Sequence, residues 1–209
     1  MPRTKEQYEA LRAASLAKVQ AAAITLFARR GFAATSMRDV ARAAGISTGL
    51  IYRHYETKEE LFAALVDYAA AGLHRVVERF GEAESPAELL DEFTRTFLTD
   101  LAGDGAFAEF FLIMNQAFMT HDESPQLQRL RTAHALLVDA VIALVGRGQE
   151  RGEFRSGRPA ELASCYLAAL SGLATMRLLP DTRLAVPGPS TLMRLLLRQD
   201  DHDRGNARP

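Results

Sequence analysis

Apolar residues recur at helical spacing from one end of the chain to the other, and alternating runs of β-branched residues are nearly absent. This pattern is typical of amphipathic helices, and it predicts an all-α protein with about nine of them. The first helix is expected from about Lys5 to Arg30, where Gly31 interrupts the pattern. Its apolar stripe consists of Leu16, Val19, Ala23, Ile24 and Phe27.

Three further helices are predicted close behind the first. One short helix follows Thr35-Ser36, either of which can be its N-cap, and another covers about 48–54. A long helix begins near Thr57, where a glutamate three residues on completes a capping box, and it runs to Phe80. Its apolar stripe consists of Phe62, Leu65, Val66, Ala69, Leu73, Val76, Val77 and Phe80.

Serine and proline mark the starts of the later helices. "SPAEL" (85–89) combines a serine N-cap, a proline at the first helical position and a glutamate three residues after the serine. "SPQL" (124–127) and "RPAEL" (158–162) are similar starts, and the leucine-rich "STLMRLLLR" (190–198) is expected to be the last helix. Loops are predicted over 103–107 and 182–190.

Residues 37–55 fit two short helices joined by a tight turn. Gly45 can adopt the positive φ that ends the first helix, because it has no Cβ. Ala41 is small enough for the two helices to meet, Ile46 fills the gap between them, and Ser47 can cap the second. A small residue, a glycine four positions later and an apolar residue six positions after that is the spacing of a helix-turn-helix.

The second short helix leaves polar side chains facing outward. Thr48 and Gly49 lie at its N-terminal end, the part of a helix-turn-helix that enters the major groove of DNA. Gly49 allows close approach to a base edge, and Thr48 can bond a base or touch a thymine methyl. Hydroxyl, imidazole and ammonium groups nearby can bind phosphate oxygens. The predicted DNA-contacting residues are Ser36, Arg38, Ser47, Thr48, Gly49, Tyr52, His54 and Lys58.

These residues belong to a stretch with a family resemblance. "TSMRDVARAAGISTGLIYRHYETKEEL" (35–61) resembles the DNA-binding domain of the TetR (tetracycline-repressor) family of bacterial regulators, and "AAAITLFARRGFAAT" before it resembles the family's first helix. The resemblance covers about 15–65, and the rest of the chain is similar only in its helical layout. One departure is Tyr55, where the family more often has Phe. We expect Tyr55 to pack rather than to contact DNA.

The resemblance implies a homodimer that binds a near-palindromic operator and usually represses transcription. It also implies a C-terminal ligand cavity whose occupation releases the DNA. The expected domains are a helix-turn-helix domain over 1–57, a helical effector-binding and dimerisation domain over 58–200, and a disordered tail over 201–209. Dimerisation would place the two recognition helices about 34–36 Å apart, one turn of DNA.

Charge is unevenly distributed along the chain. The net charge is −1, yet residues 1–60 carry ten Lys or Arg and six Asp or Glu, so this end is basic and the remainder is acidic. A basic end on an acidic body favours a module that faces a polyanion, joined to a second module.

Several other classes of protein are disfavoured. The N-terminus lacks the apolar run of a signal peptide, and the apolar stretch 162–176 is shorter than the roughly 20 residues of a membrane span. Cys165 is the single cysteine, so no disulfide can form within the chain, which fits a cytoplasmic protein. No pair of catalytic groups can be placed, and we expect neither an enzyme nor a bound metal or cofactor.

Large and adaptable apolar residues gather in the middle of the chain. Six of the eleven phenylalanines fall between Phe93 and Phe118, with Met114 and Met119 among them, and such residues suit a cavity for a small, largely apolar effector. His134 lies in an apolar stripe and Asn115 lies beside Met114, so both are candidate polar contacts. The predicted ligand-binding residues are Phe93, Phe97, Phe110, Phe111, Met114, Asn115, Phe118 and His134. A packed core is the alternative for each of them.

The helix over 159–179 is apolar on more than one side and needs a second partner. We expect it to meet its copy, together with the last helix, in a two-fold four-helix interface. The predicted interface residues are Leu162, Tyr166, Leu167, Leu170, Ala174, Leu178, Leu192, Leu195 and Leu196.

Coupling between effector and DNA is expected to run through the fourth helix, which begins at the DNA module and ends in the effector domain. Two alternatives stay open. One is an activator or a global DNA-binding regulator of the same fold. The other, more remote, is a helical ligand-binding protein or enzyme.

Overall fold

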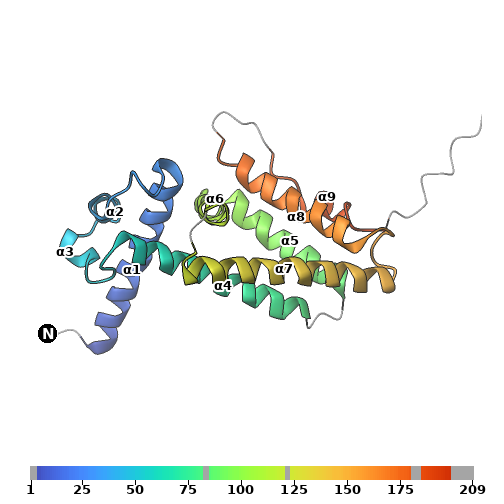
Figure 1. Ribbon diagram of the computed structural model, residues 1–209, viewed down its shortest axis with the longest axis horizontal. Coiled ribbons are helices and arrows are strands. Elements are labelled where there is room, and N and C mark those ends of the chain that lie inside the picture. Colours follow the sequence, from blue (N-terminus) through green and yellow to red (C-terminus); the bar gives the residue numbers. More distant parts are fainter. Residues whose placement is uncertain (1–3, 82–84, 121–122, 180–184, 199–209) are drawn as a thin grey trace, which may run out of the picture. The chain divides into compact units, whose positions relative to one another are not determined.

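The computed structural model describes residues 4–81, 85–120, 123–179 and 185–198. Within these residues the chain forms nine helices and no strand (Figure 1), which confirms the predicted all-α fold. In chain order the helices are α1 (Lys5–Arg30), α2 (Met37–Ala43), α3 (Thr48–Ile51), α4 (Lys58–Gly81), α5 (Pro86–Ala102), α6 (Ala106–Phe118), α7 (Pro125–Glu150), α8 (Pro159–Met176) and α9 (Pro189–Met193). The expected tail over 201–209 lies outside the described residues.

The chain divides into two compact units. Unit 1 comprises Met1–Ala71 and Asp104–Arg131, and unit 2 comprises Gly72–Gly103 and Thr132–Pro209. Helices α4 and α7 each continue without a break from one unit into the other. Packing therefore groups α6 with the N-terminal helices, whereas the expected functional division after residue 57 stays a prediction.

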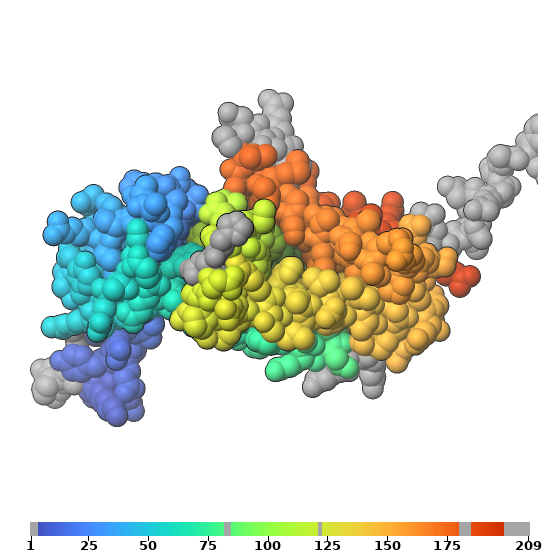
Figure 2. All heavy atoms as spheres, in the orientation of Figure 1, coloured from blue at the N-terminus to red at the C-terminus, as the bar shows by residue number. Residues whose placement is uncertain are grey.

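Helix α1 has the predicted bounds and forms one wall of unit 1. The hydroxyl of Thr4 caps it by accepting a hydrogen bond from the N–H of Gln7 (3.3 Å). Its first turns protrude from unit 1 (Figure 2), and every described residue up to Ala14 is exposed. The later turns pack against α2 and α6, where the buried residues of α1 are Val19, Ala23 and Phe27.

A buried carboxylate joins α6 to α1. Glu109 on α6 is only 5% exposed. It accepts hydrogen bonds from the hydroxyl of Thr25 (2.7 Å) and from Nε of Arg29 (2.8 Å). Sequence reasoning missed this residue, although Glu109 is the single charged residue of a largely apolar helix, which is a usable signal.

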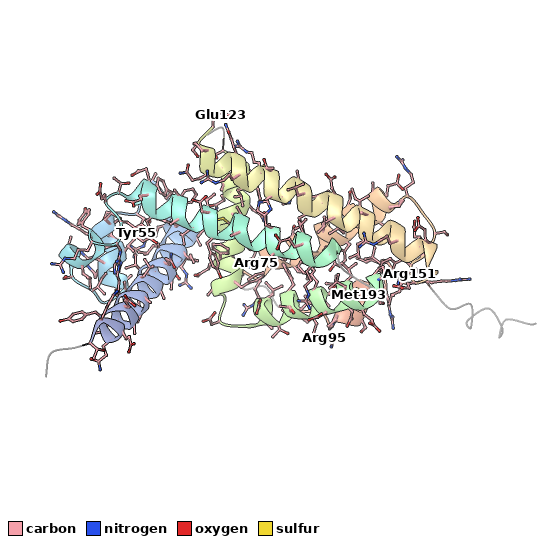
Figure 3. The ribbon with its side chains drawn as sticks, turned by 90° about the horizontal axis from the view of Figure 1, so that it is seen from below. Tyr55, Arg75, Arg95, Glu123, Arg151 and Met193 are labelled. Carbon is pink, nitrogen blue, oxygen red and sulfur yellow. The ribbon has the colours of Figure 1, made fainter. Side chains whose placement is uncertain are left out.

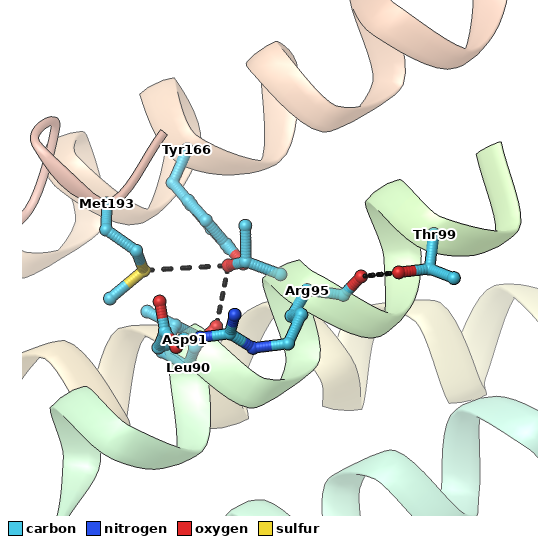
Figure 4. Close-up of polar contacts among 7 residues, drawn as sticks. Leu90, Asp91, Arg95, Thr99, Tyr166 and Met193 are labelled. Carbon is cyan, nitrogen blue, oxygen red and sulfur yellow. Dashed lines mark hydrogen bonds and ion pairs between the residues drawn. The ribbon is translucent and has the colours of Figure 1, made fainter. Parts of the chain in front are cut away.

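Unit 2 is centred on a buried hydroxyl pair between α5 and α8 (Figure 4). Thr94 donates a hydrogen bond to the carbonyl oxygen of Leu90 (2.6 Å), and its Oγ1 lies 2.7 Å from the phenol oxygen of Tyr166. Because a threonine hydroxyl has one hydrogen, Tyr166 is the donor in the second bond. Burial raises the pKa of Tyr166, so the phenol stays neutral. The sulfur of Met193, 3.5 Å from Thr94 Oγ1, brings α9 against α5.

The last helix is shorter than the predicted 190–198. Helix α9 ends at Met193, and the chain beyond it pairs with the segment that follows α7. The N–H of Arg155 donates to the carbonyl oxygen of Leu196 (2.8 Å), and Phe154 and Leu197 form an antiparallel bridge. These backbone bonds replace the helical ones that would have continued α9.

Two of the predicted helix starts are capped as expected. Ser85 accepts a hydrogen bond from the N–H of Glu88 (3.3 Å), and Thr57 accepts one from the N–H of Glu60 (3.0 Å). The carboxylate of Glu60 accepts from the N–H of Glu56 (2.7 Å), so the second bond of this capping box is displaced by one residue.

One described helix, α1, is long and apolar enough to cross a membrane by length and composition alone. Core helices and N-terminal signal sequences pass the same test, so this feature is weak evidence for a membrane span.

Candidate nucleic-acid interface

Helices α2 and α3 pack together around the turn that the sequence predicts. Gly45 has φ 67°, and the N–H of Ile46 donates to the carbonyl oxygen of Ala41 (3.0 Å). Val40 and Ile51 are fully buried and Ala41 is 2% exposed, so the inner faces of both helices are closed. A larger side chain in place of Ala41 would force the helices apart, because buried sites tolerate added volume poorly.

Helix α3 presents an open outer face. Regular helix ends at Ile51 and continues as turns to His54, so it is shorter than the predicted 48–54. Thr48 and Gly49 are exposed, and Tyr52 is 49% exposed. A Cβ added at Gly49 would meet no atom within 4 Å, which leaves room for another molecule to approach the backbone.

The start of each short helix is fixed by a serine cap. Ser47 accepts from the N–H of Leu50 (3.2 Å). Ser36 accepts from the N–H of Asp39 (3.2 Å) and donates to its carboxylate (2.5 Å), and this bond to Ser36 is the main cause of the lowered pKa of Asp39. Both serines are exposed, as is Arg38 beside Ser36. The serine hydroxyls thus have a local structural role, whichever part they take in binding DNA.

His54 and Tyr55 tie the end of the helix-turn-helix to α1. Nε2 of His54 lies 2.7 Å from the hydroxyl of Ser15, and the phenol oxygen of Tyr55 accepts a hydrogen bond from Gln20 (2.9 Å). Figure 3 labels Tyr55 where the helix-turn-helix meets α1. Tyr55 is 7% exposed, so it is packed as expected. Burial, with a smaller effect of Arg12, lowers the pKa of His54 and favours a neutral imidazole at neutral pH.

Lys58 is more enclosed than a simple phosphate contact requires. Its ammonium donates to the carbonyl oxygens of Phe32 (2.7 Å) and Thr35 (2.8 Å), and it lies 4.3 Å from the centroid of the Phe32 ring. These two bonds use two of the three N–H groups of an ammonium. Lys58 therefore joins the start of α4 to the link between α1 and α2, a structural role that sequence reasoning missed.

The predicted effector residues are divided between the two units. Phe93, Phe97 and His134 belong to unit 2, and the other five belong to unit 1. Phe97 and Met114 are buried in the core of their units. The expectation that His134 is buried in an apolar stripe is wrong, because Ala133 takes the buried position and His134 is exposed. Partial burial nevertheless lowers the pKa of His134.

Unit 1 contains a cavity of about 610 Å³ away from the predicted effector residues, lined by residues of α1, α4, α6 and the start of α7. None of the eight predicted effector residues lines it. Sequence reasoning assigned its aromatic residues Phe27 and Phe62 to helix stripes and did not find the space between them.

The predicted dimer residues fall into a buried group and an exposed group. Tyr166, Leu170, Ala174, Leu192 and Leu196 are buried within unit 2 of a single chain, which leaves them little surface for a second copy, and the predicted interface stays a prediction. Of these, Tyr166 meets the Thr94 hydroxyl of α5, and α9 packs against α5. The others keep exposed surface: Leu162, Leu167 and Leu178 are partly exposed, and Leu195 is 37% exposed.

Within the described residues, no group of three or more His, Cys, Asp or Glu side chains could hold a metal ion. The site therefore consists of a polar helix face, a set of internal hydrogen bonds that fix it, and a nearby cavity.

The chain is similar to known regulators over this site and beyond it. The sequence pattern of bacterial regulatory proteins of the tetR family matches residues 20–65. The HTH-type transcriptional repressor Rv3405c of Mycobacterium tuberculosis is 39% identical over 75 residues, which is 36% of this chain and only 38% of that protein. The HTH-type transcriptional repressor KstR2 of Rhodococcus jostii is 30% identical over 154 residues, 69% of this chain and 70% of that protein.

Solved structures agree with the fold. AibR in complex with isovaleryl coenzyme A and operator DNA has a TM-score of 0.66 and 20% identity, over 86% of this chain and 94% of that one. The family pattern covers the helix-turn-helix, and the similarity to KstR2 extends over most of both chains. The chain is a member of the tetR family of bacterial transcriptional regulators.

Proposed function

We propose that this chain is a repressor that binds near-palindromic operator DNA as a homodimer and is released by a small, largely apolar molecule. Two of the similar proteins are named transcriptional repressors, and AibR has been solved with both operator DNA and a coenzyme A thioester. These names support the proposal by analogy, and the chemistry of the site supports DNA binding independently.

One observation carries the proposal. Thr48, Gly49 and Tyr52 form an exposed row on a short helix whose opposite side is sealed by Ile51. A polar face that no part of its own unit covers, held rigidly by a glycine turn and a serine cap, suits insertion into a major groove. Thr48 and Gly49 would meet base edges, and Tyr52 would meet the backbone.

Phosphate contacts would flank this row. Arg38 is exposed at the start of α2 and is a direct candidate. His54 and Lys58 are partly enclosed by their internal hydrogen bonds, so each would contact a phosphate while still bonded to its own unit. Such preorganised contacts keep their geometry when the DNA is absent.

Dimerisation would use the outward side of α8, whose inward side is already occupied. Cys165 and Ala168 are exposed there, and Leu167 is partly exposed. Cys165 is the single cysteine of the chain, so its reaction with a thiol reagent reports on this surface alone. We expect the reaction to slow as the protein concentration rises and copies pair.

Coupling would run along α4, which is one continuous helix from Lys58 to Gly81. A ligand that binds preferentially to one orientation of α4 increases the population of that orientation. If the two recognition helices of the dimer no longer fit the DNA in that orientation, the ligand weakens DNA binding.

The test begins with duplexes selected from a random pool by the full-length protein. Fluorescence anisotropy should show specific binding, and Thr48→Ala should weaken it about tenfold or more, since a good base contact contributes roughly 1–3 kcal/mol. Thr99→Ala removes an exposed threonine on α5 and is the matched control. Equal losses in both variants, or no selected sequence, would count against the proposal.

The sign of regulation needs a separate measurement. Transcription in vitro from a promoter that carries the selected site should fall when the protein is added. A rise would favour the activator alternative, with the same DNA contacts.

A further inference from the structure

The cavity of unit 1 has the dimensions of a small-molecule site. Its volume of about 610 Å³ lies within the range of about 300–1,000 Å³ that is usual for ligand pockets. It is separate from the phenylalanine- and methionine-rich residues that the sequence suggested for the effector.

The interior of the cavity is apolar and aromatic. The rings of Phe27, Phe32 and Phe62 contact one another, with centroids 5.1 to 6.1 Å apart. Ile113 on α6 and Leu127 on α7 contribute aliphatic surface. Such walls favour an aromatic or aliphatic body, because burying apolar surface drives its binding.

The charged groups of the cavity all have the same sign. Glu59 and Glu60 on the first turn of α4 line it and are exposed, so both carboxylates stand in contact with solvent. The remaining polar lining is uncharged, with the amides of Gln116 and Gln126 among it. Of the described residues that line the cavity, none is Lys, Arg or His. The complementary ligand charge is therefore positive.

We infer that this cavity binds small molecules that combine an apolar, preferably aromatic, body with a protonated amine. The body would lie among the three phenylalanines and the amine would face Glu59 and Glu60. Neutral molecules of the same shape would bind more weakly, and anions most weakly.

The cavity also touches the groups that hold the DNA-reading helices. The ring of Phe32 lines the cavity, and the ammonium of Lys58 lies over the same ring. This ammonium also donates hydrogen bonds to the carbonyl oxygens of Phe32 and Thr35. Ser36, the cap of α2, follows directly. A ligand that displaces the Phe32 ring would disturb this set of bonds, and we expect DNA affinity to fall. This second step rests on the proposed function.

Binding is tested first, without DNA. Isothermal titration calorimetry of the full-length chain with 4-phenylbutylamine, 4-phenylbutanol and 4-phenylbutyrate compares one body with three charges. The amine should bind at least tenfold more tightly than the acid, with the alcohol between them. No heat of binding for any probe up to millimolar concentration, or tightest binding of the acid, overturns the inference.

Variants then locate the site. Ala63→Leu on α4 fills the cavity and should abolish binding of all three probes, whereas Ala71→Leu on the same helix, exposed and outside the lining, should not. The double change Glu59→Gln and Glu60→Gln should remove the preference for the amine but keep the alcohol. Glu56→Gln, also exposed and outside the lining, is the charge control. Unchanged binding in Ala63→Leu would place the probes elsewhere and overturn the assignment.

The effect on DNA is measured last, with the selected duplex. Saturating 4-phenylbutylamine should raise the dissociation constant of the duplex several-fold in the wild type and leave it unchanged in Ala63→Leu. If the protein binds no duplex, the proposed function fails while the calorimetry still decides the site. If the amine binds and the dissociation constant stays constant, the link through Phe32 is wrong.

Discussion

Charged side chains bond backbone groups in both units, but the two units differ in the side-chain pair at their centre. In unit 1, charged side chains make the connections: Lys58 bonds two carbonyl oxygens, and Glu109 joins α6 to Thr25 and Arg29. In unit 2, the centre is a pair of neutral hydroxyls, Thr94 and Tyr166, both fully buried.

The two contacts differ in solvent access. In the unit 1 pair the Arg29 side chain is 72% exposed but Glu109 is buried, so separating them would leave an uncompensated buried charge. In the unit 2 pair both hydroxyls are buried, and separating them would leave polar groups unsatisfied. Both contacts therefore hold their helices in place.

The largest predicted effect tests the core of unit 2. Leu170→Ala should lower the free energy of unfolding by about 2–5 kcal/mol, because Leu170 is buried and its truncation leaves a cavity. Leu167→Ala, three residues away and partly exposed, should cost less than about 1 kcal/mol in the isolated chain. Urea unfolding followed by circular dichroism gives both values. Similar losses would mean that α8 faces the other way.

A second prediction tests how closely unit 2 is packed. A Cβ at Gly148 would lie 2.2 Å from Phe154, so Gly148→Ala should destabilise by about 1–3 kcal/mol through overpacking. Gly146→Ala on the same helix meets its nearest atom, on Pro159, only at 4.0 Å. It should stabilise α7 by up to about 1 kcal/mol. If the two variants change the melting temperature in opposite directions, the close approach of Gly148 to Phe154 is confirmed. A change in the same direction would contradict it.

A second contrast, between local contacts and contacts of distant segments, explains what the sequence could predict. The helix-turn-helix was readable because its contacts are local: Gly45, Ile46 and Ala41 bond within five residues. The bounds of α1 and the caps at Ser85 and Thr57 were readable for the same reason.

Contacts between segments that are distant in the sequence could not be predicted from the sequence pattern. Thr94 and Tyr166 are 72 residues apart, and nothing local shows which side of α8 turns toward α5. The sequence pattern therefore predicted the helix but could not show that five of the residues assigned to a dimer interface turn inward. Likewise, the cavity depends on α1, α4, α6 and α7 meeting, which no periodicity within one helix reveals.

A third prediction compares two ion pairs, one in each unit. Glu109→Gln should cost about 1–2 kcal/mol of stability, because the amide loses the charge-assisted bond to Arg29 even though its NH2 can still donate to the Thr25 hydroxyl. Glu92→Gln breaks the exposed pair with Arg79 in unit 2 and should cost about 0–1 kcal/mol. Urea unfolding at low and high salt separates them, since screening weakens the exposed pair more. Equal costs would show that Glu109 is not a structural connection.

A small effect on stability, and the most informative one for function, is expected from Lys58→Met. Methionine keeps an unbranched apolar chain over Phe32 but removes the bonds to the Phe32 and Thr35 carbonyls, so unfolding should become easier by about 1 kcal/mol. If Lys58 also contacts a phosphate, DNA binding weakens for every sequence and the slope of log affinity against log salt falls by about one. Lys18→Met, an exposed lysine on α1, is the control for charge alone. If the melting temperature changes and the salt slope does not, Lys58 stabilises the helix-turn-helix and does not contact a phosphate. Arg38 is then the candidate for the phosphate contact, because it is exposed at the start of α2 and makes no comparable internal bond to carbonyl oxygens among the described residues.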